Sequence, residues 1–136
     1  MSYLDICRKQ LPIDEGRRTR AYKDSQGIWT VGIGRNLEHV NFSDDEIALM
    51  FANDLERADS LARVLVPNFD TLSEARKAVL VNMAVNLGPR LGQFARFLEA
   101  VRLEDFLRAA QEMEDSLWHK QVGARALRLE EAMREG

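Results

Sequence analysis

Apolar residues recur at helical spacing through the middle of the chain. Between Ile47 and Leu65 they stand three or four positions apart, and Pro67 ends the pattern. Ser43 and Glu46 stand just before it in the arrangement of a capping box, in which each side chain bonds the other residue's backbone N–H. This pattern predicts one long amphipathic helix.

The next segment, residues 78–87, is apolar on nearly every side until Gly88 and Pro89 stop it. A helix that is apolar all round is buried, so we expect this one at the centre of the molecule. Shorter apolar patterns predict further helices over residues 91–101, 103–113 and 124–133, with a tryptophan-containing turn before the last of them.

The chain opens with a short apolar stripe on a helix that Ser2 is suited to cap. Pro12 lacks a backbone N–H, and its ring clashes with the preceding helical turn. We therefore expect the first helix to kink or end near Gln10.

Residues 19–33 differ from the rest, because they are rich in aromatic, β-branched and glycine residues around a turn at residues 23–27. This composition predicts a β-hairpin. Along its second strand Trp29, Val31 and Ile33 alternate with Thr30, Gly32 and Gly34. We expect the apolar set to pack the small lobe, which turns Thr30 and the bare glycine backbone toward a cleft.

These elements predict a mainly helical α+β fold. The 136 residues suit one domain, with a small β-hairpin lobe over about residues 16–42 and a helical lobe formed by residues 1–15 and 43–136 around the buried central helix. A lone hairpin is marginal in water, so it must pack against the helices. The seam between the two lobes is then a natural cleft.

Composition narrows the classes of function. The net charge of −3 excludes the broad basic surface of a nucleic-acid-binding domain, although residues 1–40 carry seven Lys/Arg against five Asp/Glu. One cysteine and two histidines, His39 and His119, which we expect at the surface, predict no disulfide, metal or cofactor. Since no apolar run is long enough for a membrane span or a signal peptide, we expect a cytoplasmic protein without stable membrane insertion.

Three side chains form a candidate catalytic group. Glu15 stands where the first helix ends, Asp24 in the hairpin turn and Thr30 on the second strand, with the spacing E-x8-D-x5-T. An acid, a second carboxylate and a hydroxyl are the equipment of an inverting glycosidase. The alternative is structural, since a glutamate after a helix and an aspartate in a turn are both common placements. The spacing alone leaves both interpretations open.

A resemblance favours the catalytic interpretation. The string IDEG at residues 13–16, followed by AYKDSQGIWTVGIG at residues 21–34, resembles the active-site signature of the phage-type lysozymes, glycoside hydrolase family 24. The similarity continues through SDDE at residues 43–46, ARKAVLVNM at residues 75–83 and WHKQ at residues 118–121. It covers nearly the whole chain and implies a lysozyme-like fold.

The resemblance also implies roles for individual residues. Glu15 matches the general acid, Asp24 the carboxylate that positions or activates water, and Thr30 the hydroxyl that assists it. Arg125 matches an arginine that lies beside the acid in the family. The implied activity is that of an endolysin, a muramidase that cleaves the β-1,4 bond between N-acetylmuramic acid and N-acetylglucosamine in peptidoglycan for host cell lysis.

Further substrate contacts are expected from Gly32, on the cleft-facing strand, and from Arg35 and Asn86. Arg35 stands where a well-known member of the family has a histidine, and it reaches either a carboxylate or the glycan. Asn86 shares a face of the central helix with Asn82. Their amides bind either sugars or partners inside the protein, while Trp118 is expected in the core.

Two other functions stay open at this point. A lytic transglycosylase needs the acid but no carboxylate that activates water, and a silent glycan-binding or interaction module needs neither. Asp24 and Thr30 together favour hydrolysis. The expected partners are peptidoglycan strands and, for release, a separate holin, with the protein a monomer that binds no nucleic acid.

Overall fold

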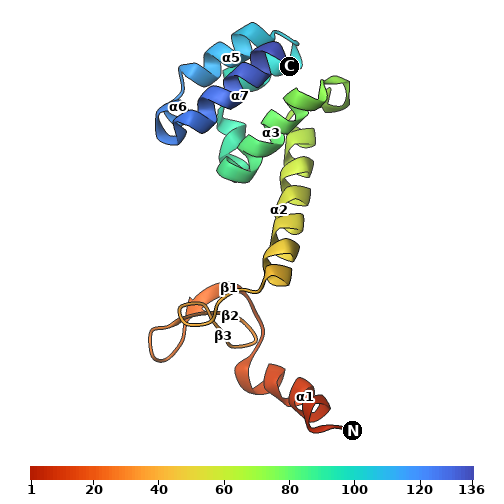
Figure 1. Ribbon diagram of the computed structural model, residues 1–136, viewed down its shortest axis with the longest axis vertical. Helices are drawn as coiled ribbons and strands as arrows, with labels where there is room; N and C mark the ends of the chain where they lie inside the picture. Colours follow the sequence, from red (N-terminus) through yellow and green to blue (C-terminus); the bar gives the residue numbers. More distant parts are fainter. The chain divides into compact units, whose positions relative to one another are not determined.

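The structure, a computed structural model, describes residues 1–136 and divides them into two compact units, Met1–Ile47 and Ala48–Gly136 (Figure 1). Helices dominate the chain, and a small antiparallel sheet lies in the first unit. The predicted mainly helical α+β class is therefore confirmed. No helix combines the length and the apolar character that a membrane span requires.

The sheet of the first unit has three strands rather than the two of the predicted hairpin. After helix α1 (Tyr3–Glu15) come β1 (Arg18–Lys23), β2 (Trp29–Gly32) and β3 (Arg35–Asn36), which pair in the order β1-β2-β3 (Figure 1). The chain reverses after β2 because Gly32 and Gly34 adopt φ values of 67° and 69°, in the left-handed region that glycine tolerates.

Helix α1 continues through Pro12 to Glu15, so the predicted end near Gln10 is wrong, and the alternative, a kink, stays a prediction. The φ that the proline ring imposes is itself helical, and the carbonyl of Arg8, which loses its N–H partner, lies on an exposed turn open to water. At the other end of the helix Ser2 and Asp5 form a capping box, which confirms the predicted cap.

The two faces of β2 are exchanged relative to the prediction. Thr30 is buried, with 5% of its surface exposed, whereas Trp29 on the other face is 44% exposed; Ile33, in the turn after β2, is 47% exposed. The hydroxyl of Thr30 donates to the carbonyl of Ile28 at 2.9 Å, which removes most of the cost of burying it. On the open face, the Lys23 ammonium lies 5.3 Å from the centre of the Trp29 ring.

The second unit is helical. Its first helix, α2, begins in the last residues of the first unit and runs through the boundary between the two. The elements are α2 (Asp44–Leu65), η1 (Phe69–Thr71), α3 (Glu74–Leu87), η2 (Gly88–Gln93), α4 (Ala95–Arg102), α5 (Phe106–Glu114), α6 (Leu117–Val122) and α7 (Ala124–Glu135).

Three boundaries differ from the prediction. The helix expected over residues 91–101 is split into η2 and α4, and the helix expected over residues 103–113 begins later, at Phe106. The tryptophan-containing turn is a short helix, α6, because the Ser116 side chain accepts a hydrogen bond from the backbone N–H of His119 and caps it.

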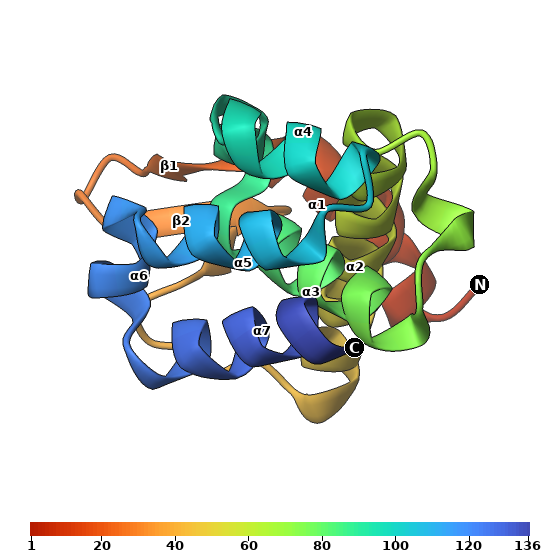
Figure 2. The ribbon, with the colours of Figure 1, turned by 90° about the horizontal axis from the view of Figure 1, so that it is seen from above.

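The core of this unit lies among α3, α4, α5 and α7. Helices α5 and α7 run side by side (Figures 1 and 2), and small residues at their contact allow close approach of the two backbones. Helix α3 supplies much of the core, as predicted, although its Val85 is exposed. The fully covered apolar side chains include Leu80, Met83, Phe97, Leu98, Val101, Ala109, Ala110, Met113, Ala126 and Met133.

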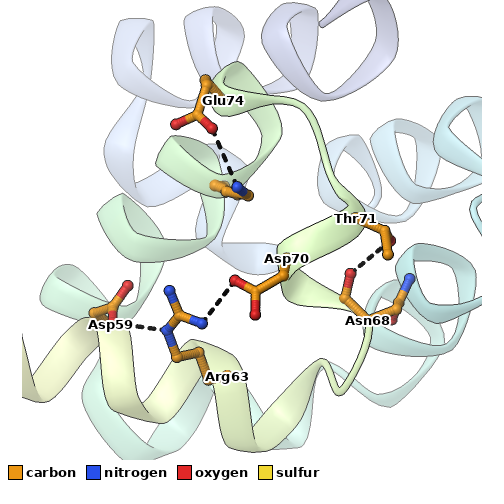
Figure 3. A network of polar contacts seen from close by, with 7 residues as sticks. Asp59, Arg63, Asn68, Asp70, Thr71 and Glu74 are labelled. Atoms are coloured by element: carbon orange, nitrogen blue, oxygen red, sulfur yellow. Dashed lines mark hydrogen bonds and ion pairs between the residues drawn. The ribbon is translucent and has the colours of Figure 1, made fainter.

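Exposed ion pairs connect the segment between α2 and α3 with the end of α2 (Figure 3). Arg63 at the end of α2 bonds Asp59 at 2.9 Å and Asp70 of η1 at 2.8 Å, and it lies 4.8 Å from the centre of the Phe69 ring. The Thr71 hydroxyl donates to the Asn68 carbonyl at 2.8 Å. The pairs of Arg63 therefore join η1 to the last turn of α2, and the Thr71 bond closes η1 itself.

One carboxylate is buried in the second unit. Glu130 of α7 is 2% exposed, and its carboxylate pairs with the imidazole of His119 on α6. His119 is half-buried, so its predicted surface position is wrong: the side chain is drawn inward by an acid that has no other partner.

This pair generates a stability prediction. His119→Ala leaves the Glu130 carboxylate buried without a partner, and we expect the free energy of unfolding to fall by about 1–3 kcal/mol in urea titrations at pH 7. The matched control is His39→Ala, an exposed histidine whose loss should cost under about 0.5 kcal/mol.

A double variant, His119→Ala with Glu130→Leu, should recover the lost stability because the buried charge is gone. Equal stability of His119→Ala and His39→Ala would show that the pair does not hold α6.

Candidate functional site

Glu15 is the last residue of α1, and Gly16, with φ at 76°, turns the chain toward the sheet. The Glu15 carboxyl lies directly against Gly34: a Cβ atom built on that glycine would stand 2.9 Å from Oε2 of Glu15. No side chain fits there without moving the carboxyl. The sequence predicted Gly34 on a strand face and did not predict its contact with Glu15. The feature that could have indicated this contact is the motif Gly-x-Gly at residues 32–34.

Asp24 is fixed by the turn between β1 and β2. Its Oδ1 accepts hydrogen bonds from the backbone N–H groups of Gln26, at 2.8 Å, and of Ile28, at 2.9 Å. Its own N–H donates to the Ile28 carbonyl at 3.0 Å. One carboxylate oxygen is therefore engaged by the turn, and Oδ2 makes no hydrogen bond.

The backbone of Ile28 connects Asp24 to Thr30. Its N–H donates to Asp24, and its carbonyl accepts from the Thr30 hydroxyl. Because the Thr30 proton points at this carbonyl, the lone pairs of Oγ1 remain available to accept a hydrogen bond from water. The sequence placed both side chains in the hairpin but did not identify Ile28 as the link between them.

Arg35 of β3 reaches a carboxylate, which is one of its two predicted partners. Its Nη2 lies 2.6 Å from Oε2 of Glu46 at the start of α2. The guanidinium stands 5.8 Å from the centre of the Phe42 ring, and its Nη1 is buried without a hydrogen-bond partner. The hydrogen bond from Arg35, and after it one from the Ser43 backbone, lowers the pKa of Glu46 from 4.5 to about 2.

Gly32 and Arg35, both expected to contact substrate, line one cavity of about 530 Å³ in the first unit. A Cβ built on Gly32 would meet no atom within 4 Å, so the backbone there borders open space. The other lining residues are Arg17, Arg18, Thr19, Val31, Ile33, Phe42 and Glu46.

The remaining expected substrate residues lie in the second unit and have internal partners. Arg125 of α7 donates from Nε to Oδ1 of Asn82 at 2.8 Å and from Nη2 to the same atom at 2.6 Å. Trp118, which is buried as expected, donates to Oδ1 of Asn86 at 2.8 Å. The Asn86 side-chain nitrogen makes no bond within the protein, so its contact with sugar stays a prediction, as does the position of Arg125 beside Glu15.

A second hollow, of about 750 Å³, lies in the second unit between α2 and the end of α3. Arg57, Leu61, Val85 and Pro89 are among its lining residues. It contains none of the residues that the sequence assigns to the site.

Comparison with known proteins identifies the family. The model of the family Phage lysozyme matches residues 13–133, so this chain belongs to that family. The match includes every catalytic and substrate-binding residue predicted above, from Glu15 to Arg125.

Relatives of this chain differ in overall size. The pre-baseplate central spike protein Gp5 of Enterobacteria phage T4 is 27% identical over 160 residues, which cover 95% of this chain but 27% of the spike protein. This chain thus spans about a quarter of that relative. Probable T4-type lysozymes 1 and 2 of Dictyostelium discoideum are 23% and 26% identical, over 90% of this chain and 89% of each relative.

The Arg35–Glu46 pair predicts a pH dependence. A carboxyl whose pKa is lower in the folded state stabilises the fold fully above its ordinary pKa, and this contribution is lost as the pH falls toward the lowered value. The stability advantage of the natural protein over Glu46→Gln should therefore be constant above about pH 5 and disappear between pH 4.5 and about 2.

An NMR titration of the Glu46 carboxyl checks the cause directly. In Arg35→Gln the pKa of Glu46 should return most of the way toward 4.5, with the Ser43 hydrogen bond keeping it somewhat lower. A midpoint near 4.5 in the natural protein would contradict the assignment.

Proposed function

We propose that this protein hydrolyses the β-1,4 bond between N-acetylmuramic acid and N-acetylglucosamine in peptidoglycan. The observation that carries the proposal is the coupling of Asp24 and Thr30 through the backbone of Ile28, in a chain of the Phage lysozyme family that has Glu15 at the end of α1. The carboxylate and the hydroxyl keep a fixed separation, as two groups that hold one water molecule must.

In the proposed mechanism Glu15 protonates the glycosidic oxygen while the bond to the anomeric carbon breaks. Water attacks that carbon from the opposite face of the ring, donates one hydrogen bond to Thr30 Oγ1 and passes its other proton to Asp24 Oδ2. The product sugar is therefore inverted. Space for the water requires the two carboxyl groups to stand about 6.5–9.5 Å apart in the productive complex.

Gly34 contributes by its lack of a side chain. Because a Cβ at this position would stand 2.9 Å from Glu15 Oε2, only glycine lets the carboxyl of the acid lie against the backbone of the sheet. Gly32 and Arg35, and in the second unit Asn86 and Arg125, complete the substrate contacts of the proposal. Lysis of a host bacterium, after release by a holin, is the biological role that we propose for this activity.

The products of the reaction distinguish hydrolysis from lytic transglycosylation and from glycan binding without catalysis. Mass spectrometry of digested peptidoglycan should find reducing ends, since water is the acceptor. A lytic transglycosylase forms 1,6-anhydromuramic ends instead, and a glycan-binding module forms no product. The fixed position of Asp24 favours hydrolysis, because transglycosylation requires no second carboxylate.

Glu15→Gln tests the acid. Glutamine keeps the shape of the side chain but has no acidic proton, so the rate of peptidoglycan solubilisation should fall about 10²- to 10⁴-fold while the protein stays folded. Asp14→Asn is the matched control, because it neutralises the neighbouring exposed carboxylate and should keep nearly full activity. Retention of more than half the natural rate by Glu15→Gln would refute the assignment.

Gly34→Ala tests the position of the acid. The new Cβ would stand 2.9 Å from Glu15 Oε2, so the carboxyl must move, and we expect about a 10- to 100-fold loss of activity. Gly88→Ala controls for backbone strain, since Gly88 also has a positive φ, 57°, but its Cβ would meet nothing within 4 Å. If both variants lose activity equally, strain rather than contact with Glu15 is responsible.

A further inference from the structure

The cavity of the first unit is lined by three cations, and the proposed function above uses only one of them, Arg35, as a substrate contact. Arg17, Arg18 and Arg35 contribute three positive charges to its wall, and Glu46 contributes one negative charge. The excess of two positive charges sits in a protein that is acidic as a whole, with a net charge of −3. The cavity is therefore a local exception to the charge of the chain.

The guanidinium groups of these arginines have few hydrogen-bond partners inside the protein. Neither Arg17 nor Arg18 makes an ion pair or a hydrogen bond through its side chain within this unit, and the Arg18 guanidinium stands 4.9 Å from the centre of the Tyr22 ring. Arg35 is held by Glu46, yet its Nη1 is buried without any acceptor. Because that nitrogen is closed off from water, a ligand in the cavity does not reach it, and the free donors of the wall are those of Arg17 and Arg18.

An oxyanion is the ligand that the free side chains of Arg17 and Arg18 suit. A guanidinium presents parallel N–H donors that match the two oxygens of a carboxylate, and such charge-assisted bonds are stronger than neutral ones. The volume of about 530 Å³ falls within the range of small-ligand sites and accommodates a charged substituent with a short length of peptide.

The position of the cavity identifies which oxyanion it meets. Arg17 follows Glu15 by two residues, and Ile33, also in the wall, precedes the Gly34 that touches the Glu15 carboxyl. A glycan strand cleaved at Glu15 would bring its own substituents to this wall. In peptidoglycan those substituents are stem peptides, which carry free carboxylates.

We propose that this cavity is a binding site for a carboxylate of the peptidoglycan stem peptide, held by Arg17 and Arg18 beside the Arg35–Glu46 pair. The inference rests on the proposed function, because it assigns part of the substrate of that activity. Glu46 keeps the Arg35 guanidinium in place through Nη2, which leaves Arg17 and Arg18 as the cations free to close on the ligand.

The test measures binding by the full chain with Glu15→Gln, so that the ligand is not cleaved. The probe is a disaccharide–tetrapeptide fragment of peptidoglycan with free carboxyl groups, compared by calorimetry with the same fragment after its carboxyl groups are amidated. We expect the free acid to bind about tenfold more tightly. Arg17→Gln and Arg18→Gln should each reduce that advantage about fivefold and leave the affinity for the amidated fragment unchanged.

Arg20→Gln is the matched control. Arg20 is an exposed arginine of β1, the same strand as Arg18, but it does not line the cavity. Its loss removes the same charge and should leave the preference for the free acid intact. Arg35→Gln is not used as the main variant because it also releases Glu46.

Three outcomes would overturn the site. The first is equal affinity for the two fragments. The second is an equal loss in Arg20→Gln, which would indicate only general attraction of anions. The third is stronger binding of a phosphodiester wall polymer, which would assign the cavity to phosphate. The test is separate from that of the activity. If the natural protein hydrolyses peptidoglycan but the Glu15→Gln chain binds both fragments equally, only the carboxylate site is refuted. If the Glu15→Gln chain prefers the free acid but the natural protein hydrolyses nothing, only the muramidase proposal is refuted.

Discussion

The backbone of Ile28 is the contact on which the geometry of the first unit depends. In this unit Thr30, with 5% of its surface exposed, is a buried residue. Hydrogen bonds among Asp24, Ile28 and Thr30 close the turn between β1 and β2. The same side chains that we assign to catalysis thus also hold the fold of the small unit, so only substitutions that preserve their hydrogen bonds separate the two roles.

The second unit is organised by a different interaction. Its helices bury a continuous set of apolar side chains, and small alanines in α5 and α7 let these helices approach closely. Polar contacts are added to that core: Arg76 of α3 donates to the carbonyls of Met133 and Arg134 at the end of α7, at 2.8 and 3.0 Å. Because α3 is fixed in this way, its Asn82 and Asn86 hold Arg125 and Trp118 in defined positions.

Charge is divided almost evenly between the two units, and only the cavity wall departs from this balance. The first unit carries seven Lys/Arg against eight Asp/Glu and the second twelve against fourteen, and many acids of the second unit form ion pairs on helix surfaces. Exposed pairs of that kind contribute little to stability. A cluster of cations with few partners, in contrast, creates a field that attracts anionic polymer and guides it toward the neighbouring acid.

The sequence by itself determined the α+β class, the long helix α2, the central helix α3, the cap at Ser2 and the three catalytic candidates. Helix periodicity, capping residues and a contiguous motif are local signals, and each is complete within a few residues of the chain. Only the tertiary structure decided that Thr30 faces inward, that β3 pairs with β2, that Gly34 lies against Glu15 and that Glu130 binds His119. Alternation along a strand separates its two faces but does not say which one is covered, and a contact between distant residues depends on how the chain turns between them.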